Sequence, residues 1–288
     1  MHDNARKRAL RAGPQMKPHT ADADFVLYQG DALEVLRELP EASVDAVVTS
    51  PPYLDARPEY TTPQLAEFAV IFHHLCRVVT GPVLLNVGRL WRDRIERLWW
   101  VDLLEEARRQ GWALLDTLVW VKPNANPIHG EVLANSHEYV FILGRAGALL
   151  NIDGIRRPHA ESTRARFGRA WTNHRGVKQP RESRARKSRA EPNPLGARPR
   201  SYVEICVGRE KGIKHPAPMA LDLAKHLVSL AAPEGSTILD PFAGSGTTAL
   251  AARLLERKAI LIERDSVYCA EAARRLSQQS LLTEATAS

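Results

Sequence analysis

Short apolar runs alternate with amphipathic stretches along most of the chain, beginning at Phe25. Runs of about four to eight apolar residues are typical of buried strands, and apolar positions spaced three and four apart are typical of helices. We therefore expect strands at residues 25–28, 44–49, 82–87, 114–121, 138–143, 236–239 and 258–262. We expect helices at residues 63–79, 92–110, 218–231 and 247–256. This alternation predicts an α/β domain with a mostly parallel sheet.

The pattern stops between about Gly144 and Ser201, where Arg, Pro and Gly dominate. Residues 156–200 hold 14 Lys or Arg against three Glu, a balance of +11 in a chain whose net charge is +7. A basic segment beside an acidic remainder indicates a surface that meets a polyanion. The expected organisation is a disordered basic tail at residues 1–22 and one α/β domain formed by residues 23–143 and 201–288. A basic insertion at residues 144–200 interrupts this domain.

The composition limits the class of protein. No apolar run among the 288 residues approaches the roughly 20 needed to span a bilayer, and the polar N-terminus lacks a secretory signal, so we expect a cytoplasmic protein with no membrane partner. The three cysteines, Cys76, Cys206 and Cys269, form no CxxC pair. We therefore expect neither a disulfide framework nor a metal site.

A glycine-rich turn follows the apolar run at residues 236–239. Residues 240–248 read Asp-Pro-Phe-Ala-Gly-Ser-Gly-Thr-Thr, and their small side chains would let a ligand approach the backbone at the carboxyl end of a parallel strand. The turn lacks the Gly-Lys-Ser/Thr of a P-loop, which disfavours a nucleotide triphosphatase. Glu263 ends the next strand, 17 residues beyond Gly246, and a carboxylate there can accept both hydroxyls of a ribose. These features predict a nucleoside cofactor.

A second motif follows the strand at residues 44–49, which runs into Ser50, Pro51, Pro52 and Tyr53. Consecutive prolines end the strand ladder and leave the Ser50 hydroxyl and the Pro51 carbonyl as acceptors. Tyr53 adds a flat aromatic face. Acceptors for an amine beside a stacking surface indicate a pocket for a flipped-out nucleobase, whereas the alternative is an ordinary Pro-Pro turn with a core tyrosine.

Together these two blocks resemble the catalytic motif and the cofactor loop of the S-adenosylmethionine-dependent DNA amino-methyltransferases of bacterial restriction–modification systems. The resemblance implies a Rossmann-like class I methyltransferase sheet, S-adenosyl-L-methionine as cofactor, and catalytic roles for Ser50, Pro51, Pro52 and Tyr53. It also relates residues 137–139 to a strand of the base pocket. The residues that it assigns to the cofactor are Asp31, Lys214, His215, Pro216, Asp240, Pro241, Phe242, Gly244, Ser245, Gly246, Thr247 and Glu263.

The order of the motifs resembles the circularly permuted subgroup called beta, because the catalytic motif precedes the cofactor loop and the basic insertion lies between them. The insertion would then be the target-recognition region, and double-stranded DNA the partner. A homodimer and a cognate restriction endonuclease acting on the same site stay open. The candidate DNA contacts are Arg164, Arg166, Arg169, Arg175 and Arg181.

The family resemblance favours cytosine as the target, because a serine at the position of Ser50 occurs more often with N4-cytosine methylation. Direct in-line transfer to a flipped base needs no covalent intermediate. Methylation at carbon 5 of cytosine is excluded because none of the three cysteines follows a proline in a strand-end loop. The alternatives are N6-adenine methylation and a nucleic-acid-binding protein with a decayed methyltransferase fold.

Overall fold

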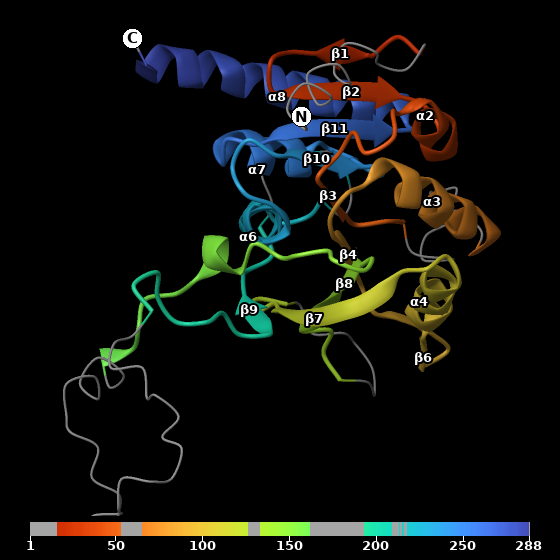
Figure 1. Ribbon diagram of the computed structural model, residues 1–288, viewed down its shortest axis with the longest axis vertical. Helices are drawn as coiled ribbons and strands as arrows, with labels where there is room; N and C mark the ends of the chain where they lie inside the picture. The colour runs from red at the N-terminus through yellow and green to blue at the C-terminus, as the bar shows by residue number, and fades with distance from the viewer. Residues whose placement is uncertain are drawn as a thin grey trace, which may run out of the picture. The chain divides into compact units, whose positions relative to one another are not determined.

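The computed structural model describes residues 16–52, 65–125, 133–161, 193–208, 213, 215 and 218–287. Its main feature is a nine-stranded sheet with the order β1-β2-β11-β10-β3-β4-β8-β7-β9, visible in Figure 1 from β1 at the top to β7 and β9 at the bottom. The strands are β1 (Thr20–Ala21), β2 (Phe25–Gln29), β3 (Ala46–Thr49), β4 (Val83–Val87), β7 (Ala113–Val121), β8 (His137–Gly144), β9 (Tyr202–Glu204), β10 (Thr237–Asp240) and β11 (Lys258–Glu263).

Most neighbouring strands in this sheet run in the same direction. The five central strands from β2 through β11, β10 and β3 to β4 are parallel, and β9 is parallel to β7. Strand β8 runs antiparallel to both β4 and β7, and β1 runs antiparallel to β2. The prediction of an α/β domain with a mostly parallel sheet is confirmed.

Helices pack on both faces of the sheet. Helices α2 (Ala32–Glu38), α3 (Leu65–Val78) and α4 (Trp99–Arg109) share one core cluster with alternate side chains of the central strands. On the other face, α6 (Leu221–Ala231) lies against β3 and β4, and α7 (Thr247–Leu254) lies against β10 and β11. Helix α8 (Ser266–Ala287) packs against α7, β2 and β11. Because both faces are covered, β3 and β4 are buried along their whole length, as parallel strands usually are.

The seven predicted strands are confirmed, each within two residues at either end, and α3, α6 and α7 lie inside the predicted helical ranges. The helix predicted at residues 92–110 begins too early, so the prediction is wrong for residues 92–98. This segment belongs to a hairpin of β5 (Leu90–Arg92) and β6 (Ile95–Arg97), in which Asp93 and Arg94 turn the chain with φ of 53° and 62°. The Arg89 guanidinium donates to both carboxylate oxygens of Glu96, at 2.8 and 2.7 Å, and this bidentate pair joins the two arms.

The N-terminal segment is also more ordered than the sequence indicated. Residues 1–15 lie outside the described residues, but Thr20–Ala21 forms β1 and Met16 packs against the core. The expectation of disorder up to residue 22 is therefore wrong for residues 20–21, since backbone pairing with β2 orders a stretch that has little apolar side-chain area. Strand β9 and helices α2 and α8 were not anticipated.

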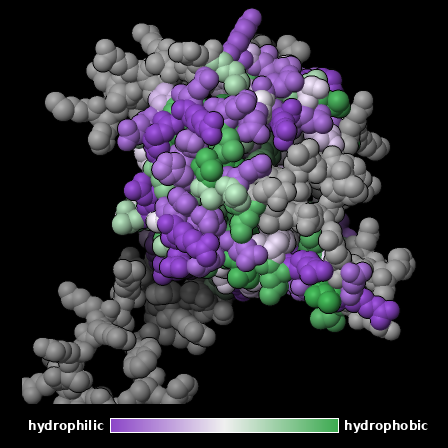
Figure 2. Space-filling view, turned by 90° about the vertical axis from the view of Figure 1, so that its right-hand side faces the viewer, coloured by the Kyte–Doolittle hydropathy of each residue, from purple (hydrophilic) through white to green (hydrophobic). Residues whose placement is uncertain are grey.

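The chain divides into two compact units. Met1–Asn151 and Ser201–Ser288 form the first unit, and Ile152–Arg200 forms the second. In the second unit, a short 3₁₀ helix covers Ile152–Ile155, and Arg157 and Ala197 exchange two backbone hydrogen bonds of 3.2 and 2.7 Å. In the described part of the chain, no helix is long and apolar enough to cross a membrane. Figure 2 shows one face on which hydrophilic side chains predominate and hydrophobic ones gather in a central band.

Candidate active site

The two sequence motifs meet where the strand connections diverge. From β10 the chain passes through α7 to β11 on one side, and from β3 it passes through α3 to β4 on the other side. Strands β3 and β10 pair only at Ile238 with Ala46 and at Leu239 with Val47. Connections that leave neighbouring parallel strands in opposite directions open a crevice at the carboxyl ends, where such sheets bind ligands. By this rule we expect a ligand crevice between residues 50–52, which follow β3, and residues 240–248, which begin at the end of β10; we call this place the crevice.

The glycine-rich turn depends on two glycines in the left-handed region. Gly244 has φ 51° and Gly246 has φ 79°. A Cβ at Gly246 would lie 3.1 Å from the Cβ of Ala272 on α8, so this glycine allows a helix, rather than a ligand, to approach closely. A Cβ at Gly244 would lie 3.0 Å from Nε2 of His215, whose ring in turn lies edge-on to Tyr268 at 4.6 Å. The structure thus brings the predicted residue His215 onto the turn.

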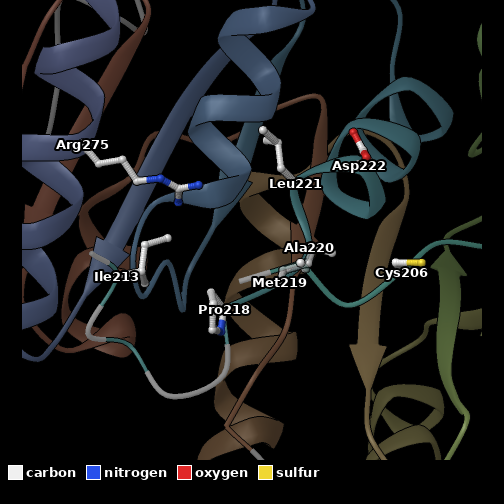
Figure 3. A pocket seen from close by; sticks show the side chains of 9 residues that line it. Cys206, Ile213, Pro218, Met219, Ala220, Leu221, Asp222 and Arg275 are labelled. Carbon is white, nitrogen blue, oxygen red and sulfur yellow. The ribbon is translucent and has the colours of Figure 1, made fainter. Parts of the chain in front are cut away.

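Arg275 of α8 hydrogen-bonds to the glycine-rich turn. Its guanidinium is buried and donates to the backbone oxygen of Ser245 at 3.1 Å and to Oγ1 of Thr247 at 2.8 Å. Arg275 also borders a cavity of about 250 Å³ whose other lining residues are Cys206, Gly208, Ile213 and residues 218–222 (Figure 3). The predicted residues Ser245 and Thr247 are therefore fixed by a residue that no sequence motif identified.

Glu263 lies at the end of β11, facing the same turn. Its Oε2 accepts from the backbone N–H of Gly244 at 2.7 Å, and its Oε1 accepts from that of Asp265 at 2.8 Å. Burial raises the pKa of the Glu263 carboxyl, and the charges of Asp240 and Asp265 act in the same direction. An ionised carboxylate has about four lone-pair positions, and donors among the described residues occupy two of those of Glu263. A carboxylate in this position can also accept the two hydroxyls of a ribose.

Asp31 lies at the end of the neighbouring strand. The backbone N–H of Gly30 donates to the backbone oxygen of Glu263 at 2.9 Å, which joins the ends of β2 and β11. Asp31 caps α2, because its Oδ1 accepts from the N–H of Leu33 at 2.8 Å. The cap orients a carboxylate at the same edge of the sheet as Glu263.

Asp240 is the most constrained acid of the site. Oδ1 accepts from Oγ1 of Thr49 at 2.6 Å and from the N–H of Phe242 at 3.1 Å, and Oδ2 accepts from Oγ1 of Thr248 at 2.6 Å. The side chain is 3% exposed, and burial raises the pKa of its carboxyl. These three contacts of Asp240 are all within the protein. Of its neighbours, Pro241 is buried, and the Phe242 ring lies 6.1 Å from that of Phe68.

Ser50 follows β3 directly. Its hydroxyl donates to the backbone oxygen of Asn86 on β4 at 3.3 Å, which leaves the oxygen lone pairs as acceptors. The buried Asn86 amide donates to Glu138 at 2.8 Å, and Glu138 also pairs with Lys122 at 3.0 Å. Pro51 is buried and Pro52 is partly buried. Next to Ser50, side-chain hydrogen bonds therefore link Asn86 of β4, Glu138 of β8 and Lys122, which follows β7.

Several predicted residues lie outside the described part of the chain: Tyr53, Lys214, Pro216, Arg164, Arg166, Arg169, Arg175 and Arg181. The sequence did not reveal the hydrogen-bonding roles of four residues at the site: Thr49, Thr248, Asn86 and Arg275. Thr49 and Thr248 stand within the quoted motifs and could have been found there as hydroxyl donors at the ends of the same two elements. Arg275 and Asn86 carry no local signal, because their partners are distant in the sequence.

Comparison with known proteins gives one family. A family model described as DNA methylase matches residues 44–274. The type II methyltransferase M.SfiI of Streptomyces fimbriatus is 30% identical over 257 residues, which cover 78% of this chain and 57% of that protein's length. The type II methyltransferase M.XycI of Xanthomonas campestris pv. cyanopsidis is 26% identical over 296 residues, 88% of each chain.

Solved structures agree on the fold. The PvuII DNA methyltransferase (cytosine-N4-specific) superposes with a TM-score of 0.68 at 18% identity, covering 91% of this chain and 89% of that one. TTHA0409 of Thermus thermophilus, a putative DNA modification methylase complexed with S-adenosyl-L-methionine, gives a TM-score of 0.58 at 25% identity, covering 89% of this chain and 95% of that one.

Proposed function

Since the chain belongs to the DNA methylase family of amino-methyltransferases, and has the motif order of its beta class, we propose that it transfers a methyl group from S-adenosyl-L-methionine to the N4 amine of cytosine in double-stranded DNA. The observation that carries this proposal is the Ser50 hydroxyl. Its hydrogen is donated to Asn86, which leaves the oxygen lone pairs as acceptors for an amine, and Ser50 follows β3, the strand paired with β10, which leads into the glycine-rich turn.

The cofactor side of the crevice has the donors and acceptors that a nucleoside needs. Glu263 can accept ribose hydroxyls beside its two backbone donors, and Asp31 supplies a second carboxylate at the next strand end. His215 and the turn from Pro241 to Thr247 border the remainder of the site, and the family resemblance assigns Lys214 and Pro216, which lie outside the described residues, to the same site. When bound, S-adenosyl-L-methionine supplies an electrophilic methyl group on a sulfonium. The protein residues orient this group and exclude water from it.

On the other side, Ser50 and Pro51 hold the target amine. The lone pair of an aromatic amine is delocalised into the ring, so the nitrogen is a weak nucleophile until it becomes more tetrahedral. Two acceptors, the Ser50 oxygen and the Pro51 carbonyl, favour that geometry by binding the two amine hydrogens. Pro52 restricts the backbone, and Tyr53 stacks on the extruded base, a contact worth roughly 1–3 kcal/mol. Flipping requires a few kcal/mol, which the stacking largely offsets.

The choice of cytosine rests on Ser50, since the family places serine at this position more often in cytosine enzymes. The likeness to the PvuII enzyme, at 18% identity, supports the fold alone. The basic insertion recognises the DNA, with Arg164, Arg166, Arg169, Arg175 and Arg181 as the candidate contacts. A homodimer and a cognate endonuclease are further partners to test.

The test is a single-turnover transfer of labelled methyl to duplex DNA, followed by nucleoside analysis. We expect label on N4 of cytosine. Label on N6 of adenine would select the other base within the same family, and label on carbon 5 of cytosine would overturn the mechanism. Ser50→Ala should lower the transfer rate while the affinity for the cofactor stays unchanged, because Ser50 contacts the amine and not the cofactor.

A further inference from the structure

We propose that Thr49 is a positioning residue for methyl transfer, because its hydrogen bond to Asp240 fixes the catalytic side of the crevice relative to the cofactor side. This inference rests on the proposed function. Thr49 immediately precedes Ser50, and Asp240 begins the glycine-rich turn, although 191 positions separate the two residues. Neither residue needs to touch the substrate in this role. We call the Thr49–Asp240 bond the crevice latch.

The latch lies where backbone pairing between the two strands has ended. The β3–β10 ladder covers only Ile238 with Ala46 and Leu239 with Val47, after which the chains diverge. Of the hydrogen bonds among the described residues, the latch is the one that joins the two strands at their carboxyl ends. At the amino ends, Asp45 performs a comparable task, accepting from the N–H of Thr237 at 2.9 Å. The pair of strands is therefore tied at both ends by a carboxylate.

The Asp240 end of the latch is rigid. Its carboxylate is held by the hydroxyl of Thr248 at 2.6 Å and by the N–H of Phe242 at 3.1 Å, both on the cofactor side. Thr49, Asp240 and Thr248 are 1%, 3% and 2% exposed, so water does not compete for these bonds. A buried hydrogen bond to a carboxylate is short and strong. Thr49 therefore attaches β3 to a part of the turn that cannot shift by itself.

The chemistry makes this attachment important. Transfer requires the amine nitrogen, held by the residue after Thr49, to lie in line with a methyl group held by the turn after Asp240. A misplacement of about 1 Å can reduce such a reaction roughly 100-fold, even when both ligands bind normally. Because the latch sets the separation of the two sides, its loss should slow the transfer step and leave cofactor binding nearly intact.

The experiment compares Thr49→Val, Thr49→Ser and Thr80→Val in the full-length protein. Thr49→Val keeps the branched shape and removes the donor, Thr49→Ser keeps the donor, and Thr80→Val is a control that removes a hydroxyl donor from an exposed threonine. Thr80 donates its hydroxyl to the backbone of Val44 at 3.2 Å, at the opposite edge of the sheet. With cofactor and DNA saturating, we expect Thr49→Val to slow single-turnover methyl transfer about 10- to 100-fold with less than about 3-fold change in cofactor Kd. Thr49→Ser should restore most of the rate.

A variant of the acid distinguishes the latch from a charge that binds the cofactor directly. In Asp240→Asn, Oδ1 can still accept from Thr49 and Phe242, and the amide can donate to the Thr248 oxygen. The latch predicts a smaller loss of rate than in Thr49→Val and a retained cofactor affinity. A tenfold weaker cofactor affinity in Asp240→Asn, with normal transfer by Thr49→Val, would overturn the latch. Equal slowing by Thr80→Val and Thr49→Val would also overturn it, since the slowing would then not depend on the hydrogen bond to Asp240.

These readouts are separate from the test of the proposed function. Methylation of adenine by the unaltered protein would change the assigned base, but the comparison of transfer rates would be the same. If the unaltered protein binds the cofactor and transfers no methyl to any DNA, both the proposed function and the latch are wrong. Thermal denaturation of each variant verifies that the measured rates come from folded protein.

Discussion

Replacing Glu263 by glutamine tests the assignment of the cofactor site most directly. The substitution keeps the size of the side chain and converts one carboxylate oxygen into an NH₂ group. In the structure both oxygens already accept a backbone N–H, from Gly244 at 2.7 Å and from Asp265 at 2.8 Å. In Glu263→Gln one of these N–H groups must face another donor, and one acceptor position for a ribose hydroxyl is lost.

The expected magnitude follows from the bonds that disappear. A hydrogen bond to a charged group contributes about 1.5–3 kcal/mol, and about 1.4 kcal/mol corresponds to a factor of ten in affinity. Loss of one such bond to the ribose therefore predicts a cofactor affinity roughly 10- to 150-fold weaker. The clash with Gly244 or Asp265 adds to this loss because it disturbs the turn itself.

Isothermal titration calorimetry with S-adenosyl-L-methionine measures the affinity. The control is Glu234→Gln, because Glu234 is exposed and precedes β10, at the opposite edge of the sheet from Glu263. The control should bind the cofactor with unaltered affinity. An affinity within about 2-fold of the unaltered protein for Glu263→Gln would refute the reasoning, since it is far less than one charged hydrogen bond contributes.

The same carboxylate predicts a pH dependence. Burial raises the pKa of Glu263 above its ordinary value of 4.5. The cofactor needs the ionised form as an acceptor, so its affinity should fall as the pH falls through this raised pKa, before ordinary glutamates titrate. For the cofactor-free protein the sign is opposite. The raised pKa stabilises the fold at low pH, and this contribution is lost as the pH rises through it. Glu263→Gln should lack the acid limb of the binding profile.

Two further predictions concern the turn and the cysteines. Gly246→Ala should destabilise the protein for two reasons: a left-handed φ of 79° costs a residue with a Cβ about 1–2 kcal/mol, and the new Cβ would lie 3.1 Å from Ala272. Gly235→Ala should lose only the first amount, because Gly235 has φ 77° and no atom lies within 4 Å of its Cβ position. Urea denaturation measures both, and equal losses would contradict the contact with α8. Burial, and to a smaller extent the charge of Glu263, raises the pKa of the Cys269 thiol to about 11. At pH 8 a thiol reagent should therefore modify the exposed Cys206 in the folded protein, and Cys269 only after the protein unfolds. Rapid modification of Cys269 in the folded state would show that α8 opens.

Local patterns in the sequence determined which segments form the sheet and where its ligand loops lie. Apolar runs predicted the seven strands, and the small residues after β10 indicated a tight turn, which has positive φ at Gly244 and Gly246. These features depend on residues that are neighbours in the chain. At residues 92–98 the local pattern gave the wrong element. Their apolar spacing predicts a helix, but these residues belong to a hairpin that the Arg89–Glu96 pair stabilises.

The tertiary structure alone decided which strands are neighbours, and with it the chemistry of the crevice. The sequence contains Thr49 and Asp240 in separate motifs, but the order of the strands places them 2.6 Å apart. The position that a Cβ would occupy at Gly246 faces Ala272 of α8, and Arg275 of the same helix hydrogen-bonds to the turn. The physical reason is that these contacts arise from burial and pairing between distant segments, whose partners cannot be identified from either segment by itself.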